Sequence, residues 1–364
     1  RASIPHLRAG GRGGSVIITS SDAGLFAYEN ISHYVSAKHG VIGLMRTLAL
    51  ELARDMIRVN AICPTTVDTD MVQNEQVDAV YVAGRTRDHA AAALQSVKAR
   101  KPVLVEKPLA LTADQARTLA EAARESDCLV MENLWCLALP AYLALRDQLA
   151  GGAYGSPVHL HFDFGYPVQP ENHASLFDPD DGGVILDRAV YGVALALNLL
   201  GPVTDVDCNA QRNDRGVDVM ADLRLHHQSG AVSHVAVALN ALMSNTASLA
   251  CTHGHLGLGA PVVGAEVLTA SQMLPAAETE ARPGAQVGLT DRIRAWPRAR
   301  KFKRKRDMSA GRFLGYGADP YLPVLTHFVE LIRGGQRESG LIPLDLSVST
   351  LEILQQARGR TVEG

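Results

Sequence analysis

Residues 101–123 read KPVLVEKPLALTADQARTLAEAA, and this stretch decides the fold of the larger part of the chain. The apolar run 102–106 has the length of a buried strand, and the Ala-rich run from Thr112 to Glu125 has the pattern of a helix. Glu106, Lys107 and Pro108 stand where the strand ends. Ligands of parallel α/β sheets bind at the carboxyl ends of the strands, so Lys107 is a candidate ligand contact, with a surface turn as the simpler alternative.

The same alternation of strand and helix extends to both sides of this stretch. Short apolar runs at 15–19, 57–63, 77–83 and 128–132 alternate with helical segments, of which the longest covers about 32–54. Five such strands predict a parallel sheet covered by helices. Beyond Leu137 the runs alternate with period two and predict a mostly antiparallel sheet, before two closing helices at about 321–333 and 344–357; these runs are 157–164, 217–225, 232–239 and 247–251. The expected fold class is therefore α/β: an incomplete Rossmann-like parallel sheet, followed by an α+β domain with an open, mostly antiparallel sheet.

Composition sets the broad class of the protein. The chain has 364 residues, 47% of them hydrophobic, which suggests two or three domains. Its longest apolar run, 189–200, is too short to span a bilayer, so no membrane association is expected. Five scattered cysteines without CxxC spacing argue against a disulfide framework and favour the cytoplasm. Because the first residue is Arg1 and no signal peptide follows, we expect the sequence to start inside a longer protein.

Charge gives little reason to expect a nucleic-acid partner. The net charge is −3, and the basic stretch 292–306 is interrupted by Pro297 and has few aromatic residues to stack on bases. A solvated loop is the simpler interpretation, and we expect a small-molecule partner instead.

A first chemical motif lies near the start of the chain. Tyr34 and Lys38, in YVSAK, are four residues apart on a predicted helix, and Ser21 lies where the preceding strand ends. A phenol is a poor base at neutral pH unless a neighbouring ammonium stabilises the phenolate, and a serine hydroxyl can hold a substrate oxygen. The alternative is an exposed helix face.

The context of this motif resembles a known family. The segments TSSDAG, YVSAKHGVIGLMRTLALELA and IRVNAICPTTVDTDM are together similar to the C-terminal half of a short-chain dehydrogenase/reductase, over about residues 13–74, and TTVDTDM looks like the mycofactocin-coupled subgroup. The resemblance implies that Ser21, Tyr34 and Lys38 are catalytic and that residues 64–69 lie beside the nicotinamide. The family's TGxxxGxG loop is not in the sequence. Gly10, Gly11, Gly13 and Gly14 precede a strand, whereas a phosphate loop follows one.

A second resemblance covers most of the chain, from about residue 76 to 358. The segments VDAVYVAGRTRDHAAAAL, KPVLVEKPLALTADQARTLAEAA and GGVILDRAVYGVALALNLLG resemble the Gfo/Idh/MocA family of oxidoreductases. The resemblance implies NAD or NADP as cofactor. It implies that Lys107 contacts nicotinamide ribose and substrate, that Asp187 orients the substrate, and that Tyr191 exchanges the proton. It also implies cofactor contacts by Glu106, Thr86, His89 and Trp135.

Some positions in this second part have other interpretations or depart from the family pattern. Asp187 is alternatively a helix cap and Tyr191 a core residue. Arg188 stands where the family has a small or apolar residue, and it either aids the acid/base chemistry or pairs with Asp187. Gly84–Arg85 replaces the usual Thr-Pro beside Thr86 and His89.

Two further features are not expected to form binding sites. The glycine-rich run 254–264 has Pro261 where a phosphate loop would start its helix, so we predict a turn of the antiparallel sheet there. We predict no metal site, because the paired histidines lack a converging carboxylate or an HExxH frame; they are His159 and His161, His226 and His227, and His253 and His255.

The sequence thus predicts three parts: a short-chain-dehydrogenase-like fragment at 1–75, the end of a dinucleotide-binding domain at 76–136, and a substrate and oligomerisation domain at 137–364. The expected function is NAD(P)-dependent hydride transfer to or from a sugar, cyclitol or related secondary alcohol or carbonyl, impaired by the missing glycine loop. One alternative is a short-chain alcohol dehydrogenase that uses Ser21, Tyr34 and Lys38. Another is a non-catalytic fusion or assembly protein whose open sheet packs on a second copy. If the five strands form one sheet, the cofactor binds weakly or not at all.

Overall fold

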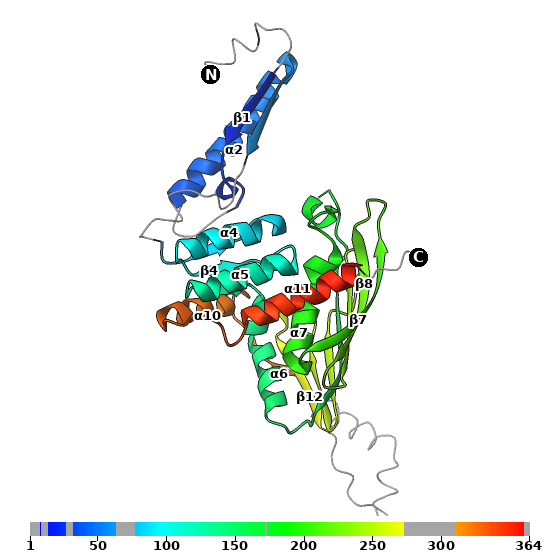
Figure 1. Ribbon diagram of the computed structural model, residues 1–364. Helices are drawn as coiled ribbons and strands as arrows, with labels where there is room; N and C mark the ends of the chain where they lie inside the picture. Colours follow the sequence, from blue (N-terminus) through cyan, green and yellow to red (C-terminus); the bar gives the residue numbers. More distant parts are fainter. Residues whose placement is uncertain are drawn as a thin grey trace, which may run out of the picture. The chain divides into compact units, whose positions relative to one another are not determined.

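A computed structural model describes Arg8 and residues 14–26, 32–62, 77–171, 173–272 and 311–359 (Figure 1). The chain divides into two compact units, Arg1–Asp70 and Met71–Gly364. The predicted nicotinamide loop at 64–69, the glycines at 10, 11 and 13, and the basic stretch 292–306 lie outside the described residues. In the described ranges no helix is both long and apolar enough to cross a membrane.

The first unit is a single βαβ element. Strand β1 (Gly14–Thr19) pairs in parallel with β2 (Ile57–Ile62), and the 21-residue helix α2 (Ser32–Leu52) connects them. Leu52, Ile57 and Val59 form its small buried cluster. The predicted strands and helix are confirmed here. The helix provides the crossover connection that two parallel strands need.

The second unit begins with a three-stranded parallel sheet in the order β3-β4-β5. Its elements follow the sequence pattern closely: β3 (Val80–Val82), α4 (Thr86–Lys98), β4 (Val103–Val105), α5 (Ala113–Glu125) and β5 (Val130–Glu132). Thr112 caps α5 in a capping box with Gln115, which satisfies amide groups that the first turn leaves unpaired. All three residues of β4 and of β5 are buried.

The expectation of one five-stranded sheet is wrong. In the described residues β1 pairs with β2, and β3 pairs with β4, so that the parallel strands form two sheets. The reason lies in the burial of β3, since a central parallel strand is buried on both faces. Val82 is buried, but Val80 is half-buried and Tyr81 is 45% exposed, which is the pattern of an edge strand.

The rest of the second unit is built on an eight-stranded sheet in the order β13-β12-β11-β10-β6-β9-β8-β7. Every pair is antiparallel except β6 with β9, so the predicted mostly antiparallel domain is confirmed. The strands are β6 (Pro157–Gly165), β7 (Val203–Arg212), β8 (Asp218–His227), β9 (Val232–Ala238), β10 (Ala247–Cys251), β11 (Gly254–Leu258), β12 (Val267–Gln272) and β13 (Arg312–Phe313).

The glycine-rich run 254–264 differs from the turn expected there. Its first half is strand β11, in which Gly257 pairs with Ser248 on one side and Thr269 on the other. Only its second half, with a short helix at Val262–Gly264, turns the chain. A Cβ on Gly257 would lie 2.7 Å from Thr269 Oγ1, so this glycine serves close packing within the sheet.

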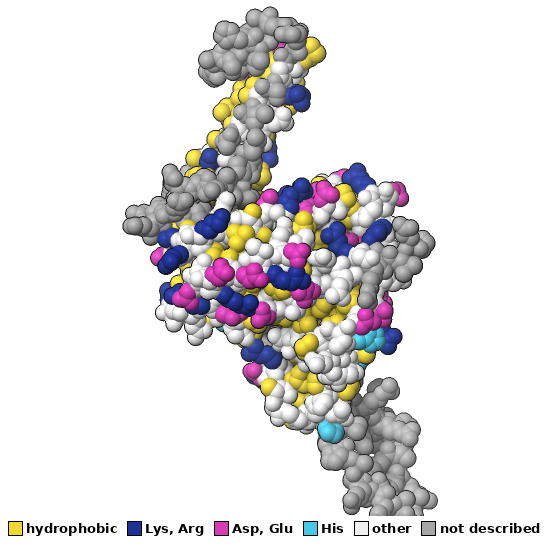
Figure 2. All heavy atoms as spheres, viewed as in Figure 1, with side chains coloured by type: hydrophobic (Ala, Val, Ile, Leu, Met, Phe, Trp, Pro, Cys, Tyr) yellow, Lys and Arg dark blue, Asp and Glu magenta, His cyan; other side chains and the backbone are white. Residues whose placement is uncertain are grey.

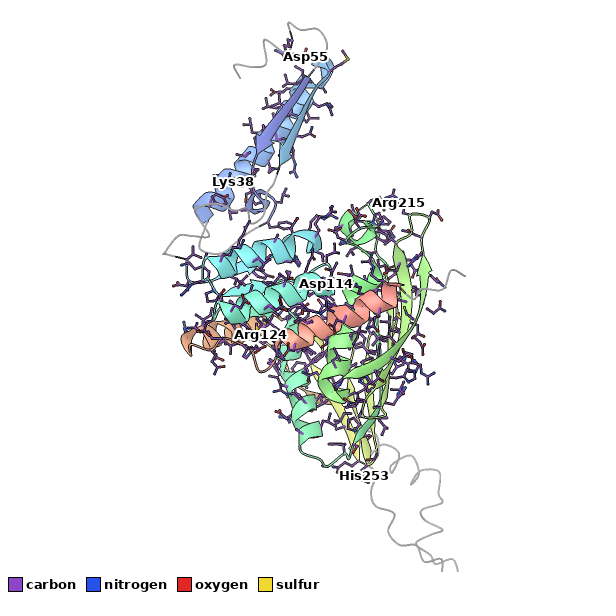
Figure 3. All side chains as sticks on the ribbon, viewed as in Figure 1. Lys38, Asp55, Asp114, Arg124, Arg215 and His253 are labelled. Carbon is purple, nitrogen blue, oxygen red and sulfur yellow. The ribbon has the colours of Figure 1, made fainter. Side chains whose placement is uncertain are left out.

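Four helices pack around the two sheets: α6 (Pro140–Ala150), α7 (Val190–Leu200), α10 (Leu322–Arg333) and α11 (Leu344–Gly359). Helix α11 contacts both α5 and α7, and so joins the two layers of the core. Exposed ion pairs, Arg117–Glu352 and Arg124–Asp345, connect α5 to α11. Acidic and basic side chains mix on the face shown in Figure 2, and Asp114 and Arg124 mark α5 in Figure 3.

Gly192 sets how closely α7 approaches the large sheet. A Cβ there would lie 2.6 Å from both Phe162 Cδ1 and Val235 Cγ1, on β6 and β9. We predict that Gly192→Ala lowers the free energy of unfolding by about 1–3 kcal/mol, because overpacking outweighs the gain in helix propensity of roughly 1 kcal/mol. Gly43 on α2 is the matched control, because a Cβ added there would meet no described atom within 4 Å. Thermal unfolding that left Gly192→Ala as stable as Gly43→Ala would contradict this packing.

Candidate functional site

Lys107 lies at the carboxyl end of β4 and is tied to a residue 80 positions later in the chain. Its ammonium donates to Asp187 Oδ1 at 2.6 Å and to the Asp187 main-chain oxygen at 2.8 Å. The two side chains are only 16% and 25% exposed. An ion pair that is this short and this shielded is screened much less than a surface pair.

Asp187 and Tyr191 come from a helix with an irregular first turn. Residues Ile185–Ala189 form a π-helical turn, which continues as α7 from Val190. Asp187 lies inside this turn, so the helix-cap interpretation is wrong for it. A wider turn of this kind often occurs at functional sites. Here it presents the Asp187 carboxylate and main-chain oxygen to the same ammonium.

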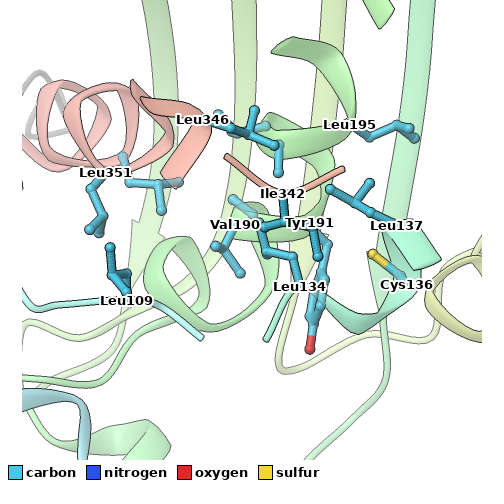
Figure 4. Packing of buried hydrophobic residues seen from close by; sticks show 14 of the residues in the cluster. Leu109, Leu134, Cys136, Leu137, Val190, Tyr191, Leu195, Ile342, Leu346 and Leu351 are labelled. Carbon is cyan, nitrogen blue, oxygen red and sulfur yellow. The ribbon is translucent and has the colours of Figure 1, made fainter. Parts of the chain in front are cut away.

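Tyr191 is buried beside this ion pair. Lys107 Nζ lies 5.2 Å from the centre of the Tyr191 ring, and Phe164 packs edge-on against the same ring. Figure 4 shows Tyr191 within the apolar cluster, with its hydroxyl at the end away from Leu346. The structure therefore brings together Lys107, Asp187 and Tyr191, which the sequence analysis selected from segments far apart in the chain.

Burial and neighbouring charges set the protonation states of Tyr191 and Lys107. Burial raises the pKa of Tyr191 above its ordinary value, and this outweighs the lowering by Lys107. Tyr191 is thus a neutral phenol at neutral pH. Burial alone would lower the pKa of Lys107, but the Asp187 carboxylate raises it above its ordinary value, and the side chain stays an ammonium.

Trp135 borders the same group of residues. It begins the short helix Trp135–Ala138 after β5, and its ring lies 5.1 Å from that of Tyr321. Trp135 lies near enough to Tyr191 to lower its pKa, against the larger effect of burial. Trp135 is half-buried and contacts Tyr191, which places it at the candidate site.

Glu106 is held in a small polar network at the same sheet edge. It accepts hydrogen bonds from the Tyr81 hydroxyl and from Asn133 Nδ2, the latter at 2.8 Å. Its second oxygen accepts from the Lys107 amide at 3.2 Å. Burial raises the pKa of Tyr81, and the nearby Glu106 carboxylate raises it further. These bonds fix the start of the Glu-Lys-Pro turn and occupy Glu106 from within the protein.

Thr86 and His89 differ in how accessible they are. Thr86 begins α4 and lines a pocket together with Lys107 and Asp187. His89 is only 2% exposed, and its ring bridges the main-chain oxygens of Pro108, at 2.8 Å, and Gly84, at 3.1 Å. The ring joins two turns of the site, and the cofactor contact of His89 stays a prediction.

The pocket beside Lys107 has a volume of about 190 Å³. It is below the roughly 300 Å³ at which sites for whole drug-sized ligands begin, so it has room for a ring-sized group. Its lining comes from the turn after β3, the Glu-Lys-Pro turn, and the segment that leads into the π-helical turn; the residues are Gly84, Arg85, Thr86, Lys107, Pro108, Ser175, Leu176, Asp181, Gly182, Gly183, Leu186 and Asp187.

Two arginines connect opposite walls of this pocket. Arg85 contacts Asp178 at 2.7 Å and Asp181 at 2.5 Å, and Arg87 contacts Asp181 at 2.8 Å. The Asp181 carboxylate is 2% exposed, so each of its oxygens needs such a partner. Arg85, the departure from the family pattern, therefore holds the chain just before Gly182 and Gly183.

Arg188 has a structural set of partners. Its guanidinium donates to the main-chain oxygens of Tyr166, at 2.9 Å, and Ala238, and lies over the Phe164 ring. Its Nε is 3.7 Å from Asp187 Oδ2, a longer contact than that of Lys107. Burial lowers the pKa of Arg188. Arg188 thus pairs weakly with Asp187 while it anchors the helix to the sheet.

The first unit places Tyr34 and Lys38 on one helix face, as predicted. Lys38 Nζ lies 5.4 Å from the centre of the Tyr34 ring and donates to the Ser20 main-chain oxygen at 3.4 Å. Ser21 is buried, and its hydroxyl accepts a hydrogen bond from the Ala23 amide at 3.2 Å.

Sequence reasoning missed the residues that support the site. Asp178, Asp181 and Arg87 form the network at the pocket, and the acidic run before Gly182 was the available signal. Buried Asp218 accepts from the Ile185 amide at 2.7 Å, and nothing in its strand pattern pointed to this. Among the described residues no cluster of His, Cys, Asp and Glu has the arrangement of a metal site.

The fold and site define an α/β protein with a lysine, an aspartate and a tyrosine beside a pocket at the sheet edge. Residues 1–80 match the family described as short chain dehydrogenase, and residues 142–257 match the GFO/IDH/MocA C-terminal domain. Both resemblances found in the sequence are thereby confirmed, and both families are oxidoreductases.

Individual relatives divide the chain in the same way. The (-)-trans-carveol dehydrogenase of Rhodococcus erythropolis is 60% identical over 75 residues, which are 21% of this chain and 27% of that protein. The trans-1,2-dihydrobenzene-1,2-diol dehydrogenase of Oryctolagus cuniculus is 26% identical over 295 residues, 79% of this chain and 80% of its own length. The chain thus spans about a quarter of the short-chain relative.

The fold also matches a solved structure. A 3-ketoreductase from Actinomadura kijaniata, crystallised with NADP and TDP-benzene, aligns with a TM-score of 0.64 at 19% identity. The alignment covers 99% of this chain and 93% of that one. The predicted fold class, an incomplete Rossmann-like sheet followed by an open antiparallel one, is confirmed.

The ion pair at the site makes a prediction about stability. Removing one partner of a shielded pair leaves the other charge without compensation, so Lys107→Met should lower the free energy of unfolding by about 2 kcal/mol. Adding Asp187→Leu should restore at least half of that loss, because the stranded carboxylate is gone. A double-mutant cycle by urea unfolding measures the coupling, and additive losses from the two single changes would contradict the pairing.

Proposed function

We propose that the chain is an NAD(P)-dependent oxidoreductase acting on a sugar, cyclitol or related secondary alcohol or carbonyl. The observation that carries this proposal is the convergence of Lys107, Asp187 and Tyr191 beside the pocket. An ammonium and a neutral phenol are the two groups that the reduction of a carbonyl needs: one polarises the oxygen, and the other protonates it.

Each of the three side chains has a distinct proposed role. Lys107, kept as an ammonium by Asp187, polarises the substrate oxygen. Tyr191, kept neutral by burial, donates the proton in the reductive direction and accepts it in the oxidative one. Asp187 orients Lys107 and, through its second oxygen, a substrate hydroxyl. Trp135 contributes an aromatic wall beside Tyr191.

The residues present fit one end of the cofactor. The pocket at Gly84, Thr86 and Lys107 has the size for the nicotinamide end, where the cofactor supplies or accepts the hydride. In the sequence no glycine-rich loop follows a strand and opens a helix, so the pyrophosphate lacks its usual support. We therefore propose binding through Thr86 and Lys107, at lower affinity than a complete dinucleotide fold gives.

A second candidate function is a short-chain alcohol dehydrogenase centred on Ser21, Tyr34 and Lys38. The contact between the Lys38 ammonium and the Tyr34 ring favours it, because an ammonium there lowers the cost of forming a phenolate. Less of that fold is in the sequence, and we rank it second.

A non-catalytic assembly protein is the remaining alternative. Whether the chain is an enzyme or an assembly protein, we propose that its eight-stranded sheet packs on a second copy. We also propose that the chain is organised as three parts, 1–75, 76–136 and 137–364. The cytoplasm is the proposed compartment, on the spacing of the cysteines, and the four described ones are free.

The test is an oxidoreductase assay of the chain with NADH and NADPH against a panel of sugars, cyclitols and their ketones. We expect Lys107→Ala to lower kcat/KM by at least a hundredfold, a typical loss when an electrostatic contact to the reacting oxygen is removed. Tyr34→Phe should leave it within twofold.

The other outcomes separate the alternatives. Activity that survives Lys107→Ala and is lost in Tyr34→Phe would overturn the proposal in favour of the short-chain site. No activity of the parent chain on any of the panel would favour the assembly protein.

A further inference from the structure

Glu132 is a buried acid that the proposed chemistry does not use. It is the last residue of β5 and is fully buried, with 0% exposure. One carboxylate oxygen, Oε1, accepts a hydrogen bond from the Leu109 amide at 2.9 Å. That amide is two residues beyond Lys107, so the bond holds the residue that follows the Glu-Lys-Pro turn against the end of β5.

The other side of the carboxyl group faces helix α11. Glu132 Oε2, Ser347 Oγ and Thr350 Oγ1 are all buried and have no well-formed hydrogen bond within the described residues. Ser347 nevertheless lies close enough to lower the pKa of Glu132. Ser347 and Thr350 are three residues apart and share a face of α11, which packs on β5. A polar carboxyl group retained in this apolar surrounding needs a reason, because burying it is costly.

The charged and titratable groups around Glu132 belong to the site. Burial raises the pKa of Glu132 to about 7, Ser347 and the Leu109 amide lower it, Glu106 raises it and Lys107 lowers it. Cys136, on the turn after β5, is the further titratable group that faces it. The carboxyl group therefore senses the charges of Glu106 and of Lys107, and Lys107 is the residue to which the proposed function gives a role.

We propose that Glu132 is the positioning residue for Lys107: its buried carboxyl group accepts from the Leu109 amide and so holds the Lys107–Leu109 turn at the end of β5. Through Leu109 it sets the height of Lys107 above the sheet edge, opposite Asp187. Helix α11 also contacts α7, which carries Tyr191, so the same helix supports both halves of the site.

The inference rests on the role proposed for Lys107, but its test needs no cofactor and no turnover. Hydrogen exchange is measured at the Leu109 amide in the parent chain, in Glu132→Leu and in Glu132→Gln, together with the acetylation rate of Lys107. Gln115→Leu is the matched control, since Gln115 Oε1 accepts from the Leu111 and Thr112 amides nearby.

We expect Glu132→Leu to speed exchange of the Leu109 amide at least tenfold, relative to the buried amide of Leu119 on α5. Acetylation of Lys107 should also speed up at least tenfold, relative to that of Lys101. Glu132→Gln keeps an acceptor and should stay within twofold of the parent. Gln115→Leu should speed hydrogen exchange at the Leu111 and Thr112 amides but not at the Leu109 amide. Unchanged exchange at Leu109, or an increase equal to that at Leu119, would overturn the proposal.

A second measurement covers the case in which Glu132→Leu does not fold. Because folding raises the pKa of Glu132 from 4.5 to about 7, its contribution to stability is present at acidic pH and is lost as pH rises through this interval. The melting temperature of the parent should therefore fall relative to that of Glu132→Gln between about pH 4.5 and pH 7. Parallel profiles would contradict the buried position of the Glu132 carboxyl group on which the proposal rests. The oxidoreductase assay with Lys107→Ala tests the proposed function separately.

Discussion

The ion pair between Lys107 and Asp187 connects the two halves of the larger unit. Lys107 lies in the turn after β4 of the parallel sheet, and Asp187 belongs to the turn that leads into α7, which packs on the antiparallel sheet. Moving a lysine ammonium out of water is unfavourable, and Asp187 compensates with both a carboxylate and a main-chain oxygen. Both residues line the pocket, so its geometry depends on this contact.

The surroundings of the pair explain why it keeps this position. On one side, Arg85 and Arg87 hold Asp178 and Asp181, and thus fix the chain that enters the π-helical turn. Gly183, in the same stretch, has a φ of 98°, and a Cβ there would lie 2.6 Å from the Asp218 carboxylate, so only glycine fits. Charged contacts and close packing thereby surround the candidate site.

Much of this arrangement could be predicted from the sequence. The strand before Lys107 and the helix that follows Thr112 have clear periodicity, and the family resemblance selected Asp187 and Tyr191. Periodicity reports only burial and local conformation, so it could not show that β3 is an edge strand. Nor could it show that His89 bridges two main-chain oxygens, since such long-range partners leave no local pattern.

In the proposed function, Lys107 forms part of a cofactor-binding site. The most direct measurement is a calorimetric and fluorescence titration of the parent chain and of Lys107→Met with NADH and NADPH. We expect saturable binding of NADH or NADPH by the parent, with a dissociation constant on the order of micromolar to tens of micromolar. Binding by Lys107→Met should be at least tenfold weaker. Absence of binding up to about millimolar, or equal affinity of the two chains, would contradict this expectation.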